Sequence, residues 1–137
     1  MDYLLAHDVG TSGAKAALVT TDGRVAATAF EPYVTRYPRP LWAEQDPQDW
    51  WRAVVATTRR LIESSGAEPH EILGLAFSTQ MVNALPVDAQ CQPLMPCISW
   101  LDARDGKRGF ELVHGFALPG MISNARPQCL RLVDEPR

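Results

Sequence analysis

The chain opens with three short apolar runs separated by two glycine-containing turns, and this pattern constrains the fold more than any other feature. The runs cover residues 4–9, 16–20 and 24–30, and the turns contain Gly10-Thr11-Ser12-Gly13 and Asp22-Gly23. Short apolar runs between such turns are typical of strands. Asp22-Gly23 favours a tight type I′ hairpin, in which both central residues take a positive φ. The sequence therefore predicts a three-stranded antiparallel meander.

A helix is predicted after the segment 31–40, whose prolines exclude a helix and favour an extended surface crossing. Asp46 can cap the free amides, Pro47 suits the first helical position, and Gly66 marks the end. The helix is expected to bury a broad face. That face is made of two adjacent apolar stripes, Trp50/Val54/Leu61 and Trp51/Val55/Ile62.

The run 72–77 follows this helix and is expected to be a strand inside the same sheet. An antiparallel meander, a crossover helix and further strands indicate an α/β domain of the ribonuclease H-like type, as in the superfamily of actin, Hsp70 and sugar kinases. Residues 82–87 and 97–101 are shorter strand candidates, and 110–116 is a helix candidate.

Composition excludes several classes of function. The apolar share of 46% and the charged share of 21% are typical of a soluble globular protein. The net charge of −3 comes without a basic stripe, so nucleic acid is not an expected partner. No signal peptide or membrane span is evident, and a cytoplasmic location is expected. Cys91, Cys97 and Cys129 are expected to be reduced thiols without a metal.

The first glycine-containing turn has the residue types that bind phosphate. Glycines let the backbone direct successive N–H groups toward one point, the hydroxyls add donors, and a lysine adds positive charge. An aspartate at the end of the first strand could hold a metal ion through water. An ordinary hairpin turn remains the alternative, since the same residue types are common in turns. The candidate cofactor-binding residues are Asp8, Gly10, Thr11, Ser12, Gly13 and Lys15, with Asp8 also the candidate metal ligand.

Four segments carry a resemblance to a known family, namely 6–15, 42–51, 80–83 and 98–104. They resemble the N-terminal domain of the FGGY carbohydrate kinases, nearest to the xylulokinase-like branch. The resemblance covers 3–104 well. It is weaker over 105–137, where 127–136 is similar to a family pattern. It implies that 1–137 is a partial N-terminal domain and that the C-terminal nucleotide-binding domain is absent.

The resemblance also implies functions for individual residues. Asp8, Thr11, Ser12 and Lys15 would face ATP and Mg²⁺ in a transfer of phosphate to a sugar or polyol hydroxyl. Val82 stands where the xylulokinase pattern has histidine, which puts xylulose in doubt. The implied sugar-binding residues are Gln80, Met81, Val82, Asn83, Asp102 and Arg104. Core packing is the alternative role for Met81 and Val82. A structural ion pair is the alternative role for Asp102 and Arg104.

Other residues are expected to be structural. His7 is interpreted as a satisfied sheet residue, and Trp42, Trp50 and Trp51 as packing residues. In the family, the catalytic aspartate and the adenosine-binding half lie downstream of the matching segments. The chain is therefore expected to hold no catalytic residue and to be inactive alone, with self-association or a missing C-terminal half as possible partners. The alternative is a non-catalytic sugar- or phosphate-binding module acting with a partner chain; an actin- or Hsp70-like ATPase is disfavoured by 42–51.

Overall fold

A computed structural model describes residues 1–104 of the 137-residue chain. These residues divide into two compact units. The first comprises 1–35 and 45–81, and the described part of the second comprises 36–44 and 82–104. The predictions for 110–116 and 127–136, like Cys129, lie outside the described residues.

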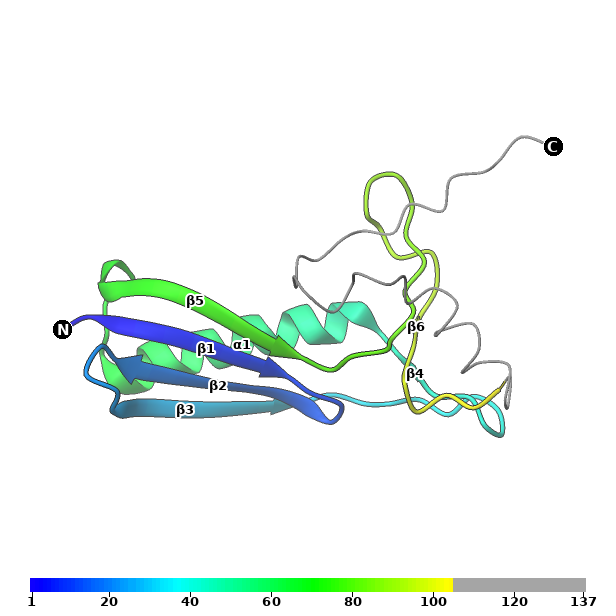
Figure 1. The fold of residues 1–137 in the computed structure, drawn as a ribbon, viewed down its shortest axis with the longest axis horizontal. Helices are drawn as coiled ribbons and strands as arrows, with labels where there is room; N and C mark the ends of the chain where they lie inside the picture. Colours follow the sequence, from blue (N-terminus) through cyan, green and yellow to red (C-terminus); the bar gives the residue numbers. More distant parts are fainter. Residues whose placement is uncertain (105–137) are drawn as a thin grey trace, which may run out of the picture. The chain divides into compact units, whose positions relative to one another are not determined.

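The first unit is built on a four-stranded sheet with the order β3-β2-β1-β5 (Figure 1). The strands β1 (Tyr3–Val9), β2 (Gly13–Thr20) and β3 (Val25–Pro32) pair as an antiparallel meander. The strand β5 (Ile72–Thr79) lies parallel to β1. The predicted meander is confirmed, with β2 and β3 longer than expected.

The hairpin between β2 and β3 uses a different turn from the one expected. Gly23 has a φ of 89°, but Asp22 is not among the residues with positive φ. The Gly23 N–H donates to the carbonyl oxygen of Thr20 at 2.8 Å, and the Thr20 N–H donates to that of Arg24 at 2.8 Å. This is the three-residue loop in which a turn is followed by one glycine in the left-handed region. The predicted hairpin is therefore confirmed, but the prediction of a type I′ turn is wrong.

The helix α1 (Pro47–Ser65) begins and ends where the sequence indicates. The Asp46 carboxylate accepts the N–H of Gln48 at 2.9 Å, and Pro47 occupies the first turn, where its missing N–H costs nothing. Gly66 ends the helix with a φ of 68°. A single 3₁₀ turn, η1 (Pro69–Glu71), then leads into β5.

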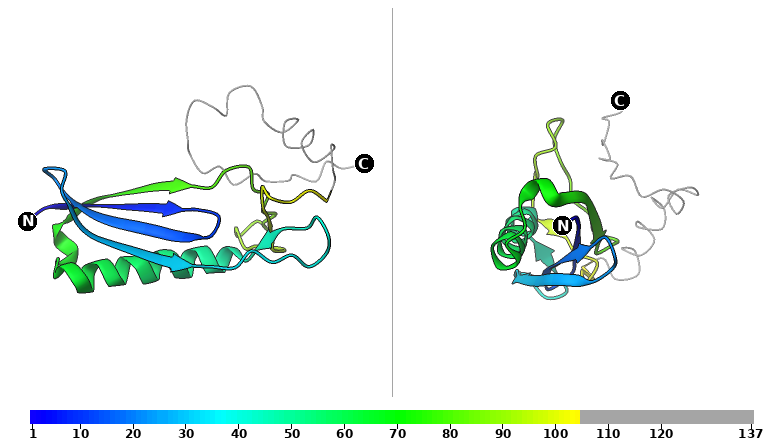
Figure 2. Two further views of the ribbon diagram at one scale, coloured as in Figure 1. Left: turned by 90° about the horizontal axis from the view of Figure 1, so that it is seen from below. Right: turned by 90° about the vertical axis from the view of Figure 1, so that its left-hand side faces the viewer.

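The helix packs across β2 and β3 on one face of the sheet (Figure 2). The stripe of Val54 and Leu61 is buried as expected. The prediction that the second stripe is buried is wrong at Trp51, which is 64% exposed. The main core cluster joins the helix to the sheet and comprises Leu5, Ala16, Leu18, Leu61 and Ala67.

The position of β5 differs from the expectation that it would lie inside the sheet. Within residues 1–104, β5 pairs with β1 alone and so forms an edge. The crossover through α1 explains the parallel pairing, but it does not supply a strand for the other side of β5. Leu73, Leu75 and Phe77 are consequently more than half exposed, at 62%, 58% and 51%.

The described part of the second unit has little regular structure. The strand β6 (Cys97–Ile98) pairs with β4 (Glu44–Gln45), a short strand at the boundary between the units. The expected strand over 82–87 is reduced to isolated bridges at Ala84 and Val87. Val82 has a φ of 63°, which is incompatible with a regular strand. The expected strand over 97–101 ends at Ile98.

Candidate functional site

The predicted phosphate turn connects β1 to β2. It is closed by the N–H of Gly10, which donates to the carbonyl oxygen of Gly13 over 3.1 Å. Thr11 and Ser12 lie between the glycines, and the Ser12 side chain is exposed. Its exposed hydroxyl is accessible to an anion, and glycine-containing turns are a residue pattern that binds anions in proteins.

Tyr33 holds this turn against the residues that follow β3. Its phenol donates to the carbonyl oxygen of Gly10, and its backbone N–H donates to that of Ser12 at 3.2 Å. Burial raises the pKa of Tyr33 to about 12, and the negative charge of Asp8 acts in the same direction. The phenol therefore stays protonated and remains a donor. Sequence reasoning missed this residue.

The two glycines of the turn have different roles. A Cβ atom on Gly13 would lie 2.5 Å from Cε2 of Phe30 and 2.6 Å from the carbonyl oxygen of Glu31. A Cβ atom on Gly10 would meet only the carbonyl oxygen of Gly13, at 3.5 Å. Gly13 is thus required by the close approach of β3, whereas the space around Gly10 accepts a methyl group.

Asp8 and Lys15 lie opposite each other at the end of the sheet that carries the turn. Asp8 is the pairing partner of Lys15 in β2 and of Ser78 in β5, so all three side chains lie on one face. Asp8 and Lys15 are both exposed. This face therefore offers one carboxylate and one ammonium group beside the turn.

The single carboxylate of Asp8 beside the turn is compatible with a Mg²⁺ ion that takes most of its other ligands from water and from phosphates. In residues 1–104 no group of three or more His, Cys, Asp or Glu side chains could hold a metal ion. Mg²⁺ needs no such group, because it keeps several waters and binds through one or two carboxylates together with substrate phosphates. The exposed carboxylate of Asp8 beside the turn fits that requirement.

Gln80 follows β5 and lies beside the turn. Its backbone N–H donates to the carbonyl oxygen of Val9, the residue before Gly10, at 2.9 Å. Because β1 and β5 are parallel, their carboxyl ends meet at one edge of the sheet. The structure thus brings one implied sugar-binding residue next to the candidate phosphate-binding residues. Met81, the next residue, is 76% exposed, which argues against the core-packing alternative.

A buried glutamine joins these two parts of the site. Gln45 is 1% exposed. Its Nε2 donates to the carbonyl oxygen of Thr11 and to Oγ1 of Thr35, both at 2.7 Å. Its Oε1 accepts from Nε1 of Trp50 at 3.0 Å and from Nε2 of Gln80 at 2.7 Å. Sequence reasoning missed Gln45, because its role comes from hydrogen bonds to residues distant in the sequence.

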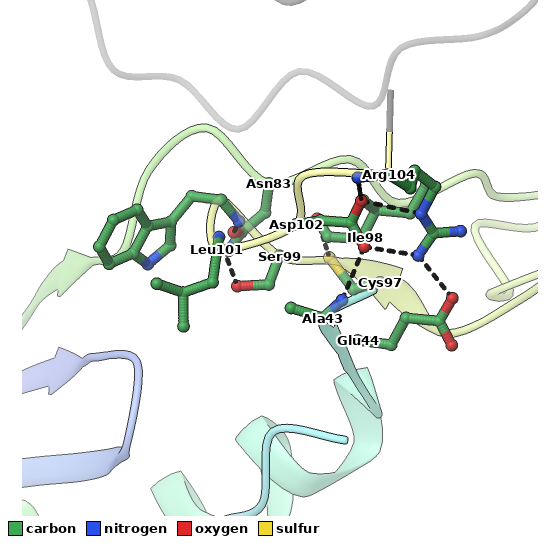
Figure 3. A network of polar contacts seen from close by, with 10 residues as sticks. Ala43, Glu44, Asn83, Cys97, Ile98, Ser99, Leu101, Asp102 and Arg104 are labelled. Atoms are coloured by element: carbon green, nitrogen blue, oxygen red, sulfur yellow. Dashed lines mark hydrogen bonds and ion pairs between the residues drawn. The ribbon is translucent and has the colours of Figure 1, made fainter. Parts of the chain in front are cut away.

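The remaining implied sugar-binding residues belong to the second unit. Val82 is 58% exposed and is not a core residue. Oδ1 of Asn83 accepts the N–H of Trp100 at 2.9 Å, a contact between the loop after Val82 and the loop after β6 (Figure 3). Asn83 therefore has a structural contact of its own, and sugar binding by these residues stays a prediction.

Asp102 and Arg104 form the ion pair that was the alternative to sugar binding (Figure 3). Nε and Nη2 of Arg104 donate to the two oxygens of Asp102 at 2.8 and 2.7 Å. Nη2 also reaches Glu44 at 2.7 Å, and the guanidinium lies 3.7 Å from the ring centre of Trp42. The Asp102 carboxylate further accepts the N–H of Ala43 at 2.7 Å.

Burial would raise the pKa of Asp102, but hydrogen bonds from Arg104 and Ala43 and the charge of Arg104 outweigh it and hold the pKa below its usual value. The same bond to Asp102, aided by Glu44, raises the pKa of Arg104 against the effect of burial. Asp102 and Arg104 are therefore both ionised at neutral pH. The group fixes the segment around Trp42 to the one around Asp102.

His7 is only half satisfied. Its Nε2 lies 3.1 Å from Oγ1 of Thr58, but its buried Nδ1 has no partner in the described part of the chain. The ring stacks on Phe77, with ring centres 5.2 Å apart. Burial lowers the pKa of His7. A neutral ring in the sheet is the consequence, so the interpretation of His7 as a fully satisfied residue is wrong at one nitrogen.

Comparison with known proteins gives consistent matches. Residues 3–112 match the family described as FGGY family of carbohydrate kinases, N-terminal domain. A xylulose kinase of Escherichia coli strain K12 is 39% identical over 93% of this chain and 30% of its own length. A glycerol kinase of Citrifermentans bemidjiense is 30% identical over 98% of this chain and 26% of its own length. The chain thus spans less than a third of either relative.

Solved structures agree with these matches. A structure from Brucella ovis, described as a xyloylose kinase, has a TM-score of 0.75 and 34% identity over 80% of this chain and 23% of its own. The expected ribonuclease H-like α/β fold is confirmed by this likeness. Within residues 1–104, no helix is long and apolar enough to cross a membrane.

Proposed function

Because this chain belongs to the FGGY family of carbohydrate kinases, matching its N-terminal domain over residues 3–112, we propose that it carries the phosphate-facing and sugar-facing residues of an ATP-dependent carbohydrate kinase. The reaction is transfer of a phosphoryl group from ATP to a hydroxyl of a sugar or polyol. The observation that carries this proposal is the bond between the Gln80 N–H and the Val9 carbonyl oxygen, 2.9 Å long. It supports the proposal because it holds Gln80, the residue proposed to face the sugar, beside the turn proposed to bind phosphate.

On this proposal the turn binds the phosphates of ATP. The hydroxyl of Ser12 would donate to a phosphate oxygen, and Lys15 would offset the negative charge of the phosphates. Asp8 would hold Mg²⁺, and the bound ion would supply charge neutralisation for the phosphates. Tyr33 keeps the turn in place through its contacts with Gly10 and Ser12.

The proposed acceptor is a small polyhydroxylated molecule. The two relatives described above are named for xylulose and for glycerol, and this chain is 39% and 30% identical to them. Val82 offers no polar group to such a molecule, whereas Gln80 offers an amide. A sugar or polyol of this size is therefore the proposed class, and xylulose is one member to be tested.

Phosphoryl transfer also requires a group that accepts the proton of the attacking hydroxyl and a site for the adenosine. We assign neither to residues 1–104. The relatives are more than three times as long as the matched region, which is 30% of the E. coli protein. On this proposal those two functions lie in sequence outside the match, and the 137 residues alone bind ligands without turning them over.

Calorimetric titration of the 137-residue chain with ATP·Mg²⁺, glycerol and xylulose tests the proposal. Binding of ATP·Mg²⁺ is expected to weaken about three- to tenfold in Lys15→Met, because one partly solvated contact to phosphate is lost. The matched control is Arg59→Met, which removes an exposed cation from α1, and it should leave binding unchanged. Equal losses in both variants would show that the turn is not the phosphate site.

A further inference from the structure

Gln45 makes four hydrogen bonds in the first unit, and their chemistry fixes the orientation of its amide group. The indole N–H of Trp50 can only donate, so the atom 3.0 Å from it must be the oxygen of Gln45. The backbone carbonyl of Thr11 can only accept, so the atom 2.7 Å from it must be the nitrogen. A flipped amide would face like groups at both contacts. The orientation is therefore set by two partners with unambiguous roles.

This orientation determines that of Gln80. Oε1 of Gln45 is an acceptor, so the Gln80 atom 2.7 Å from it must be Nε2. The Oε1 atom of Gln80 is then the free end of the amide. It is buried and has no hydrogen-bond partner within the described residues. An unpaired buried acceptor is costly and calls for a donor.

We propose that Gln45 is a positioning residue that couples the phosphate turn to Gln80 and orients Gln80 so that its Oε1 accepts a hydrogen bond from a ligand hydroxyl. This inference rests on the proposed function, because it assigns the sugar or polyol to Gln80. It adds a mechanism of communication. A shift of the turn at Thr11 reaches the amide of Gln80 through one intervening side chain.

The coupling can be tested without ligand by NMR on the isotope-labelled 137-residue chain. Gln45→Met keeps the size of the side chain and removes all four hydrogen bonds. We expect the Gln80 side-chain amide protons to exchange with water about threefold faster or more, which is the effect of losing one hydrogen bond. The backbone amides of Ser12 and Gly13 should shift in the same variant. The matched control is Gln48→Met, the same change at an exposed glutamine of α1.

Unchanged Gln80 signals in Gln45→Met, or equal changes in Gln48→Met, would overturn the coupling. If Gln45→Met does not fold, Thr35→Val provides the test. It removes one acceptor of Gln45 and leaves the bond to Thr11 in place. A shift of the Gln80 side-chain signals in Thr35→Val supports the coupling, and its absence refutes it.

Titration with glycerol and xylulose tests the ligand hydroxyl. The expected result is a shift of the Gln80 side-chain carbonyl signal on saturation, together with an affinity about three- to tenfold lower in Gln45→Met. If the wild type binds neither probe while the ligand-free shifts occur as expected, the coupling stands and the assignment to a ligand fails together with the proposed function. If a probe binds without moving the Gln80 signal, the assignment to Gln80 alone fails.

Discussion

The phenol of Tyr33 donates a hydrogen bond to the carbonyl oxygen of Gly10, a residue 23 positions earlier in the chain. With the bond from its own N–H to Ser12, Tyr33 ties both sides of the predicted phosphate turn to the end of β3. The turn is therefore held by tertiary contacts as well as by its own backbone bond.

Tyr33→Phe is expected to lower the free energy of unfolding by about 1 kcal/mol, since it removes one partly buried hydrogen bond and keeps the ring. Urea denaturation measures this change, and hydrogen exchange at Ser12 and Gly13 should accelerate. Tyr37→Phe is the matched control, because Tyr37 is 66% exposed. A turn whose exchange rates are the same in both variants would contradict the role given to Tyr33.

Gly13→Ala is expected to destabilise the first unit by about 1–3 kcal/mol, the usual cost of forcing extra volume into a packed site. The added methyl group would meet the backbone oxygen of Glu31 at 2.6 Å, and a backbone atom in a sheet cannot move aside easily. Gly10→Ala has no such contact and should change stability by less than about 0.5 kcal/mol. Thermal unfolding of both variants makes the comparison. Equal melting temperatures would show that β3 can retreat from the turn.

The local features of the fold could be predicted from the sequence, and the long-range ones could not. Asp46, Pro47 and Gly66 fix the ends of α1 through contacts with their immediate neighbours, so their sequence positions suffice. Asp22-Gly23 signals a hairpin, but the same dipeptide fits two turn types, and only the register of β2 with β3 decides between them. The edge position of β5 depends on which strands pair with it, which no local pattern encodes.

The candidate site shows the same division. The residue types of the turn from Gly10 to Gly13 indicated phosphate binding, and the family resemblance implied Gln80; the structure places the two next to each other, and their binding roles stay predictions. The roles of Gln45 and Tyr33 could not be predicted, because they come from hydrogen bonds between distant parts of the sequence. Gln45 bonds to partners that are 34 and 35 positions away in the chain, and Tyr33 to a partner that is 23 positions away. The ion pair of Asp102 with Arg104 was open between two interpretations. The contacts of Arg104 with Glu44 and Trp42 favour the structural one.

Arg104→Lys is expected to loosen the second unit even though it keeps the positive charge. A lysine cannot make the two parallel bonds to Asp102 or stack its flat group on Trp42, and we expect a loss of about 1–2 kcal/mol. Arg104→Met should cost about 3 kcal/mol or more, because it leaves the partly buried carboxylates of Asp102 and Glu44 without their cationic partner. The readout is hydrogen exchange at the Ala43 N–H, which is bonded to Asp102 at 2.7 Å.

Arg39→Lys is the control for both variants, since Arg39 is exposed and its guanidinium also lies near Trp42, 4.9 Å from the ring centre. Slow exchange at Ala43 in Arg104→Met would show that the ion pair does not hold this segment.

We expect the buried His7 to make the folded chain less stable on acidification. Oγ1 of Thr58 already donates to the carbonyl oxygen of Val54 at 2.8 Å, so at its contact with His7 it accepts, and the ring carries its proton on Nε2. Burial lowers the pKa of His7 in the folded chain below the ordinary value of 6.5. Below that value the unfolded chain binds more protons than the folded one. The free energy of unfolding therefore falls as the pH drops from 7 through 6.5 toward the lower pKa of the folded state.

His7→Phe removes this titration and the unpaired Nδ1, while the ring can still stack on Phe77. At pH 7.5 we expect its stability to lie within about 1 kcal/mol of the wild type, because the lost bond to Thr58 and the lost unpaired acceptor offset each other. Between pH 7 and pH 5 its stability should fall less than that of the wild type. His70→Gln changes an exposed histidine and should keep the wild-type pH dependence. Urea denaturation at several pH values measures all three proteins. If His7→Phe loses as much stability on acidification as the wild type, the effect arises from other groups and the neutral, buried state of His7 is not its cause.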